Sequence, residues 1–102
     1  MSQATILLMS DHARRGFFGI GDNATTYAKT ALRTANFTTT ITLECDEEGA
    51  MAAEEMFDLT NNPNRQDERE RRYGRLRSIS TGDIVRVDGF DYLCLSFGWT
   101  LL

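Results

Sequence analysis

The sequence of 102 residues has few of the side chains from which metal and disulfide sites are built. It contains two cysteines, Cys45 and Cys94, and a single histidine, His12. The cysteines do not form a CxxC pair, and three such residues cannot supply the four nitrogen or sulfur ligands of a usual zinc site within one chain. We expect both thiols to be reduced and buried, because a free cysteine packs as a small apolar side chain. We expect no metal ion and no cofactor.

Long apolar runs are also absent. The apolar stretch of residues 5–9 is far shorter than the ~20 residues that a membrane-spanning helix needs. No basic segment precedes it, as one would in a secretory signal peptide. We therefore expect a cytoplasmic protein without a membrane partner.

Basic residues are outnumbered, with 11 Lys and Arg against 15 Asp and Glu and a net charge of −4. This balance disfavours nonspecific nucleic-acid binding, which depends on cations that neutralise phosphates. The charges are also segregated, because residues 44–58 contain acids but no base whereas residues 65–77 contain six arginines. We expect the two blocks to neutralise each other in the fold, although each exposed pair contributes little to stability.

Several segments have the patterns of β-strands. Residues 4–9 are apolar and predict a short buried strand. Residues 37–45 alternate and predict a half-exposed antiparallel strand. The face expected to point inward consists of Phe37, Thr39, Ile41, Leu43 and Cys45.

The C-terminal region predicts a β-hairpin. Residues 83–87 are rich in β-branched side chains, and Asp88-Gly89 favours a type I′ turn, in which both central residues have positive φ. The second strand, residues 90–97, carries bulky side chains on both sides, so we expect both of its faces to be covered. Gly82 and Gly98 delimit the hairpin.

Two helices are predicted. Residues 24–35 place apolar side chains at a spacing of three to four, and a second helix is expected to begin with Asp46 as N-cap and to run to about Thr60. Asn61-Asn62-Pro63-Asn64 should end it. Near residues 62–77 we expect a charged, mobile connector, part of which can be helical.

These elements predict a single α+β domain over residues 1–102. We expect a small antiparallel sheet of about four strands with one or two helices packed on one face.

Motifs for catalysis are weak. The glycine-rich segment Gly16–Asp22 has neither the GxGxxG spacing nor the Lys-Ser/Thr of a P-loop, so we interpret residues 10–23 as a loop with hydrophobic anchors. Ser10-Asp11-His12 contains the residue types of a triad, but consecutive side chains diverge. We therefore expect no catalytic residues. A hydrolase or transferase that uses His12 with Ser10, Asp11 or a cysteine is the third hypothesis for function.

The C-terminal half carries a resemblance to a known family. Residues 77–94 read Arg-Ser-Ile-Ser-Thr-Gly-Asp-Ile-Val-Arg-Val-Asp-Gly-Phe-Asp-Tyr-Leu-Cys, and Phe-Gly-Trp follows at residues 97–99. With the upstream helix, residues 52–61, this pattern resembles small proteins of actinobacterial phages and plasmids, a family without established catalytic residues. The resemblance covers residues 37–102. It implies provenance and fold rather than a particular chemistry.

The leading hypothesis is a non-enzymatic phage or plasmid accessory protein that binds a host protein in the host cytoplasm. Its surface would be the acidic helix, the arginine connector or the C-terminal aromatic residues. The alternative is a nucleic-acid-associated protein whose connector arginines contact phosphates. Both a monomer and a homodimer paired through the Thr-rich strand are compatible with the sequence. The candidate partner-binding residues are Glu54, Glu55, Asp58, Arg69, Arg72, Arg75 and Trp99.

Overall fold

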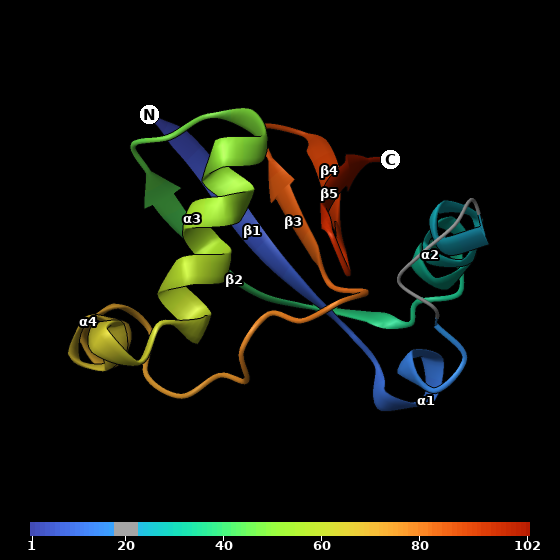
Figure 1. Cartoon of the computed structure of the whole chain (residues 1–102), viewed down its shortest axis with the longest axis horizontal. Coiled ribbons are helices and arrows are strands. Elements are labelled where there is room, and N and C mark those ends of the chain that lie inside the picture. Colours follow the sequence, from blue (N-terminus) through green and yellow to red (C-terminus); the bar gives the residue numbers. More distant parts are fainter. Residues whose placement is uncertain (18–22) are drawn as a thin grey trace.

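The computed structural model describes residues 1–17 and 23–102 and shows an α+β fold. Its centre is a five-stranded antiparallel sheet in the order β2-β1-β3-β4-β5 (Figure 1). The strands are β1 (Ser2–Met9), β2 (Phe37–Cys45), β3 (Ile84–Val87), β4 (Phe90–Leu95) and β5 (Gly98–Leu101). The helices are α1 (Asp11–Arg14), α2 (Asn23–Arg33), α3 (Gly49–Asn61), the 3-10 helix η1 (Pro63–Arg65) and α4 (Gln66–Arg72).

One face of the sheet packs against α3. The core on this face joins Ile6 of β1 and Val85 of β3 to Met56 and Leu59 of α3, and all four side chains are fully buried. Cys45 and Cys94 lie in the same cluster as free, buried thiols. The expectation that both cysteines are buried is confirmed.

The opposite face of the sheet packs against α2. Leu7, Ile84 and Leu93 form a second cluster with Ala24 and Ala28 of α2. Because side chains alternate along a strand, these residues point away from the side that α3 covers. Figure 1 shows the strands lying between α3 and α2. The expectation that the helices pack on one face was therefore wrong, since β1, β3 and β4 are apolar on both sides.

Strand β2 changes faces along its length. Ile41, Leu43 and Cys45 contact the α3 cluster as expected, but Phe37 packs with residues on the α2 side. The register explains the difference, because Ile6 pairs with Ile41 whereas Leu7 pairs with Thr39. Thr40 is thus an extra residue, a β-bulge that reverses the alternation. Its Oγ1 donates to the Ile6 carbonyl oxygen at 2.9 Å.

The predicted hairpin between β3 and β4 is present. Asp88 and Gly89 have φ values of 51° and 89°, as a type I′ turn requires. The chain then adds β5 after a tight turn at Ser96 and Phe97, which brings Leu95 opposite Gly98. This fifth strand was not expected. Gly98 has a φ of 90°, which suits the left-handed residue of a bulged hairpin turn.

Helix α3 begins later than predicted. Its N-cap is Glu48, whose side chain makes no capping hydrogen bond, and not Asp46. Residues 46–48 carry the chain from β2 across to the helix, and Gly49 turns it with a φ of 57°. The helix ends at Asn61, one residue beyond the predicted end at about Thr60. The segment expected to be a charged, mobile connector, residues 62–77, contains η1 and α4.

A buried carboxylate fastens the loop that precedes β3. Asp83 is fully buried, and its Oδ1 accepts hydrogen bonds from the Met9 amide and from Arg77 Nη2, both at 2.8 Å. Its Oδ2 accepts from Arg77 Nη1 at 2.6 Å and from the Ser80 amide at 2.8 Å. The hydrogen bonds to Asp83 raise the pKa of the Arg77 guanidinium. One side chain thus joins the end of β1 to the loop before β3.

The same loop is tied to the end of α3. Ser78 Oγ donates to the Thr60 carbonyl oxygen at 2.6 Å, and the Ile79 amide donates to Thr60 Oγ1 at 3.1 Å. Asn61 Nδ2 donates to the Ile79 carbonyl oxygen at 3.0 Å, while the Ile79 side chain is buried in the core. The loop therefore sets the position of α3 over the sheet.

The helices of the described ranges, residues 1–17 and 23–102, include none with the length and apolar character needed to cross a bilayer.

Replacing the buried carboxylate should be costly. Asp83→Ala leaves Arg77 without its acceptor and deprives the Met9 and Ser80 amides of theirs. We expect the free energy of unfolding to fall by about 3 kcal/mol, measured by urea denaturation. The control is Asp91→Ala, which removes a cross-strand ion pair to Arg86 that is more accessible to water and should cost less than about 1 kcal/mol. Equal losses for the two variants would contradict the role given to Asp83.

Candidate functional site

An aromatic contact joins α3 to β5 at the surface. Trp99 Nε1 donates a hydrogen bond to Glu54 Oε2 at 2.8 Å. The Phe57 ring meets the Trp99 ring edge-on, with centroids 6.4 Å apart and an interplanar angle of 87°. The contact leaves both rings only partly buried against the α3 core. A hollow of about 140 Å³ beside them is lined by these three residues and by Cys94, Leu95, Ser96 and Gly98.

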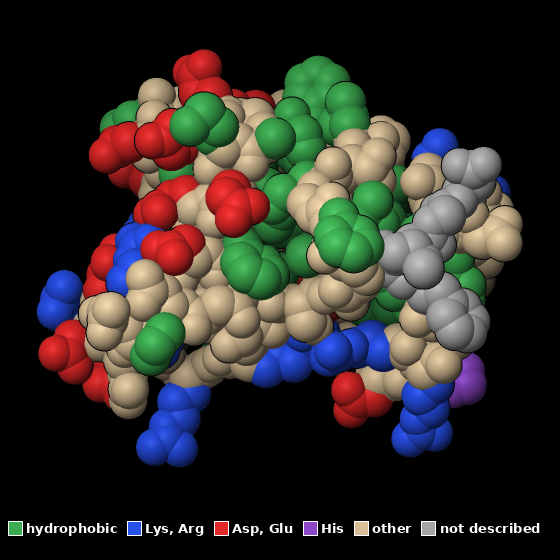
Figure 2. All heavy atoms as spheres, in the orientation of Figure 1, with side chains coloured by type: hydrophobic (Ala, Val, Ile, Leu, Met, Phe, Trp, Pro, Cys, Tyr) green, Lys and Arg blue, Asp and Glu red, His purple; other side chains and the backbone are tan. Residues whose placement is uncertain are grey.

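Exposed apolar side chains surround this contact. Phe97 at the β4–β5 turn is 89% exposed, Met51 on α3 is 65% exposed and Leu101 on β5 is 52% exposed. Figure 2 shows apolar side chains gathered over α3 and the β4–β5 hairpin, with acidic side chains beside them. A cluster of exposed large apolar residues is more informative than single ones, because such patches mark interaction sites. We call this surface the aromatic–acidic face; it consists of Met51, Glu54, Phe57, Phe97, Trp99 and Leu101.

The acidic residues of α3 fall into two groups. Glu55 and Asp58 bind Arg65, whose Nη1 lies 2.8 Å from Glu55 Oε1 and 2.9 Å from Asp58 Oδ2. Arg65 Nε also lies 2.9 Å from Glu68 Oε1. Glu54 instead turns to Trp99 and stays exposed. The expected neutralisation of the acidic block by the arginine block is therefore present at Arg65, but it does not extend to Glu54.

Electrostatics support the tight pairing of Arg65. The hydrogen bonds that Arg65 donates to Glu55 and, next in size, to Glu68 raise the pKa of the Arg65 guanidinium. In return, the hydrogen bond from Arg65 lowers the pKa of Glu68. The cluster thus holds η1 and α4 against α3.

Two of the predicted partner-binding arginines are used within the fold. Arg69 Nη1 donates to the carbonyl oxygens of Leu59 at 2.9 Å and Asn62 at 2.6 Å, so it caps the end of α3. Arg72 Nη2 donates to the Glu44 carbonyl oxygen at 2.9 Å. Arg75 is exposed and makes no hydrogen bond or ion pair with the described residues.

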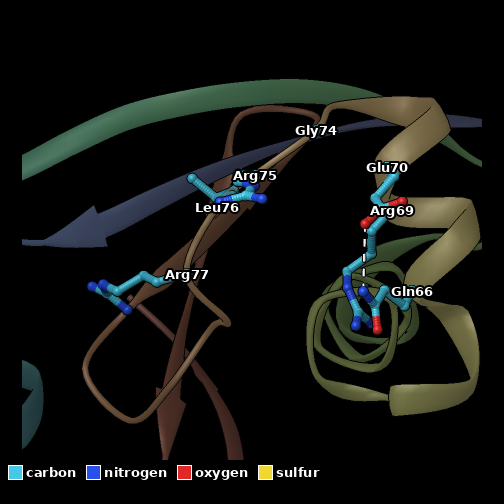
Figure 3. A pocket seen from close by; sticks show the side chains of 7 residues that line it. All are labelled: Gln66, Arg69, Glu70, Gly74, Arg75, Leu76 and Arg77. Atoms are coloured by element: carbon cyan, nitrogen blue, oxygen red, sulfur yellow. Dashed lines mark hydrogen bonds between the residues drawn. The ribbon is translucent and has the colours of Figure 1, made fainter.

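A hollow of about 560 Å³ lies between α4 and residues 74–77 (Figure 3). Its wall includes three arginines, but Arg69 is bound to the end of α3 and Arg77 to Asp83. Figure 3 shows the Arg69 and Arg77 side chains well apart, and Glu70 lies on the same wall. The guanidinium groups therefore do not converge on one point, as a phosphate site would require.

Of the residues named for a hydrolase or transferase, Ser10 has a local structural role and His12 lies at the surface. Ser10 Oγ accepts a hydrogen bond from the Ala13 amide at 3.2 Å as the N-cap of α1, and it donates to Asn36 Oδ1 at 3.1 Å. His12 is exposed on α1. Residues 18–22 of the glycine-rich segment lie outside the described residues. Within the part of the chain that the structure describes, no group of three His, Cys, Asp or Glu side chains could hold a metal ion.

Sequence reasoning named Glu54 and Trp99 separately but missed their contact. It also missed Met51 as an exposed side chain. One signal was available, since Met51 stands three and four positions before Glu54 and Glu55 and so shares their side of the helix. A single exposed apolar residue is common on protein surfaces, so Met51 becomes informative only together with the exposed Phe97 and Leu101.

No protein-family model, curated protein or solved structure matches the chain. The resemblance of residues 37–102 to phage and plasmid proteins therefore stays a prediction.

Removing Arg65 should destabilise the fold measurably. Arg65→Ala leaves the carboxylates of Glu55, Asp58 and Glu68 close together without their shared cation. Because these groups are partly exposed to solvent, we expect a loss of only about 1–2 kcal/mol in the free energy of unfolding, measured by urea denaturation. Arg75→Ala is the matched control and should change stability by less than about 0.5 kcal/mol. A loss for Arg75→Ala as large as for Arg65→Ala would contradict the assignment.

The thiol under the aromatic–acidic face should be unreactive. Burial, assisted by the negative charges of Asp83 and Glu54, raises the pKa of Cys94 from 9.0 to about 11. In a Cys45→Ala background, alkylation by iodoacetamide near neutral pH should be slow for the folded protein and fast in urea, because the thiolate is the nucleophile.

The raised pKa of Cys94 also favours the folded state below pH 9, and this contribution to the free energy of unfolding should be lost as the pH rises towards about 11. The Cys94→Ala variant should not show this loss of stability between pH 9 and about 11. Equal alkylation rates with and without urea would contradict the burial of the thiol.

Proposed function

We propose that this protein is a non-enzymatic binding protein that docks a segment of a partner protein on the aromatic–acidic face. The observation that carries the proposal is the set of exposed apolar side chains Met51, Phe97 and Leu101 around the partly buried Trp99 and its hydrogen bond to Glu54. Aromatic and methionine side chains are enriched at protein interfaces, where a few of them supply most of the binding energy.

The chemistry of the face indicates the kind of partner. Apolar anchors would cover Phe97 and Leu101, while a Lys or Arg would pair with Glu54, which binds no cation among the described residues. The net charge of −4 favours approach of a basic segment. The resemblance to phage and plasmid proteins supports a host protein as this partner, met in the host cytoplasm.

The nucleic-acid alternative has less support. It requires connector arginines that are available for phosphates, yet Arg65, Arg69 and Arg72 donate to protein acceptors. Only exposed arginines such as Arg75 are left for that role in the described segment.

Substitutions on the face should abolish capture of the partner. The experiment is an affinity pull-down of the tagged protein from actinobacterial lysate, analysed by mass spectrometry at low and high salt. Glu54→Lys and Phe97→Ser should each lower recovery of the partner by about tenfold or more, as loss of an interface anchor does. Neither substitution removes a buried side chain, so the urea midpoint should stay close to that of the unmodified chain.

The matched control is Glu70→Lys, which makes the same charge change on α4, away from the face. Recovery should be unaffected by it. A partner retained at full level by Glu54→Lys and Phe97→Ser would contradict the proposed face. Recovery of nucleic acid alone, lost at high salt, would favour the arginine alternative instead.

A further inference from the structure

We infer that β5 is an acceptor strand, to whose open edge an extended segment of basic and apolar residues adds as a further antiparallel or parallel strand. This inference rests on the proposed function and specifies how the partner docks. Addition of a strand to a sheet edge is a common mode of peptide recognition, in which main-chain hydrogen bonds give affinity and alternate side chains give specificity.

The two edges of the sheet differ in protection. The sheet ends at β2 on one side and at β5 on the other. Strand β2 carries the bulge at Thr40, and Arg72 reaches from α4 to donate to the Glu44 carbonyl oxygen. Bulges and covering side chains are devices that prevent pairing at an edge. Strand β5, Gly98–Leu101, has no Pro, Lys or Arg.

The main chain of β5 presents hydrogen-bonding groups to the open side. The Leu102 amide donates to the Asp91 carbonyl oxygen at 2.9 Å, so the main chain at Leu102 points towards β4. Main-chain groups alternate along an antiparallel strand, so those of Trp99 and Leu101 point away from β4. Within the described residues, no loop or side-chain hydrogen bond engages them. Two N–H and two C=O groups are thus available to an added strand.

Side chains beside this edge indicate what the added strand contains. Trp99 and Leu101 pair with Cys94 and Tyr92 and share the side of the sheet that α3 covers. An added strand would lie about 4.8 Å from β5, with alternate side chains next to these two residues. A Lys or Arg beside Trp99 would reach the Glu54 carboxylate, and an apolar residue two positions away would cover Leu101.

A second copy of the chain fits this edge less well. Pairing of two β5 strands about a two-fold axis would bring Glu54 of both copies to one interface without a cation supplied by the strand itself. A basic segment satisfies the same carboxylate, so charge complementarity favours it.

The test uses a labelled synthetic peptide of the repeat Lys-Thr-Val-Thr, which places lysine and valine two positions apart on one face of an extended strand. Binding is followed by fluorescence anisotropy. We expect this peptide to bind the unmodified chain and to slow hydrogen exchange of the Trp99 and Leu101 amides. Two further peptides are N-methylated at the alternate amides of one edge or of the other. The peptide that is methylated on the edge facing β5 loses the donors that an added strand needs, and should bind at least about tenfold more weakly. Glu54→Lys should weaken binding by a similar factor, whereas Arg75→Ala should not change it.

Each outcome decides a different point. Equal binding of the plain and N-methylated peptides would overturn strand addition and leave the aromatic–acidic face as the docking site. No binding of either peptide would also overturn strand addition, while recovery of a partner in the pull-down would keep the proposed function. A concentration-dependent dimer in sedimentation, with the same amides protected in the absence of peptide, would identify a second copy as the occupant and overturn the basic segment.

Discussion

The fold depends on one carboxylate that has been removed from water. A buried charge is costly unless every lone pair is satisfied, and Asp83 meets that condition through Arg77 and the amides of Met9 and Ser80. These donors belong to the end of β1 and to the loop before β3. If either segment moved, the Asp83 carboxylate would lose hydrogen bonds or become exposed to water. The main chain extends the link to β4, because the Cys94 amide donates to the Asp83 carbonyl oxygen at 2.9 Å. The position of the β4–β5 hairpin follows from that anchor.

The same loop decides where α3 lies. Thr60 and Asn61 at the end of the helix bond to Ser78 and Ile79, and this places Glu54 within reach of Trp99 on the hairpin. Residues 77–94, on which the predicted resemblance rests, therefore contain Asp83 and most of the residues that hold this loop in place. Arginines of η1 and α4 likewise hold those helices to α3. The charged segment that invites a nucleic-acid interpretation contributes to the fold through Arg65, Arg69 and Arg72, and the partner surface that we propose is the aromatic–acidic face.

Local patterns predicted the elements better than their packing. Asp88-Gly89 specified the hairpin because its turn requires positive φ at both residues, which is a property of the chain itself. The reversal at Phe37 was not visible, because a bulge in a run of threonines depends on the register with β1. Coverage of both sheet faces could have been inferred from the apolar run Ile6-Leu7-Leu8, which leaves no polar side on the strand. The contact of Glu54 with Trp99 spans 45 positions, so no local pattern predicts it. Arg69 and Arg72 donate to main-chain carbonyl oxygens, which every residue has, so the sequence does not indicate these partners.

Exposure on the aromatic–acidic face is difficult to explain by folding alone. Burial of apolar area stabilises a fold by roughly 25 cal/mol per Å² only where the area leaves water, and Phe97 remains 89% exposed. Its turn needs a left-handed residue at Gly98 but does not need an aromatic ring at its tip. Trp99 differs, since packing on Phe57 and the bond to Glu54 give it a role in the folded chain. For Phe97 and Met51, the free energy of apolar burial is gained only when a second surface covers them. These two residues therefore argue for a partner more strongly than Trp99 does.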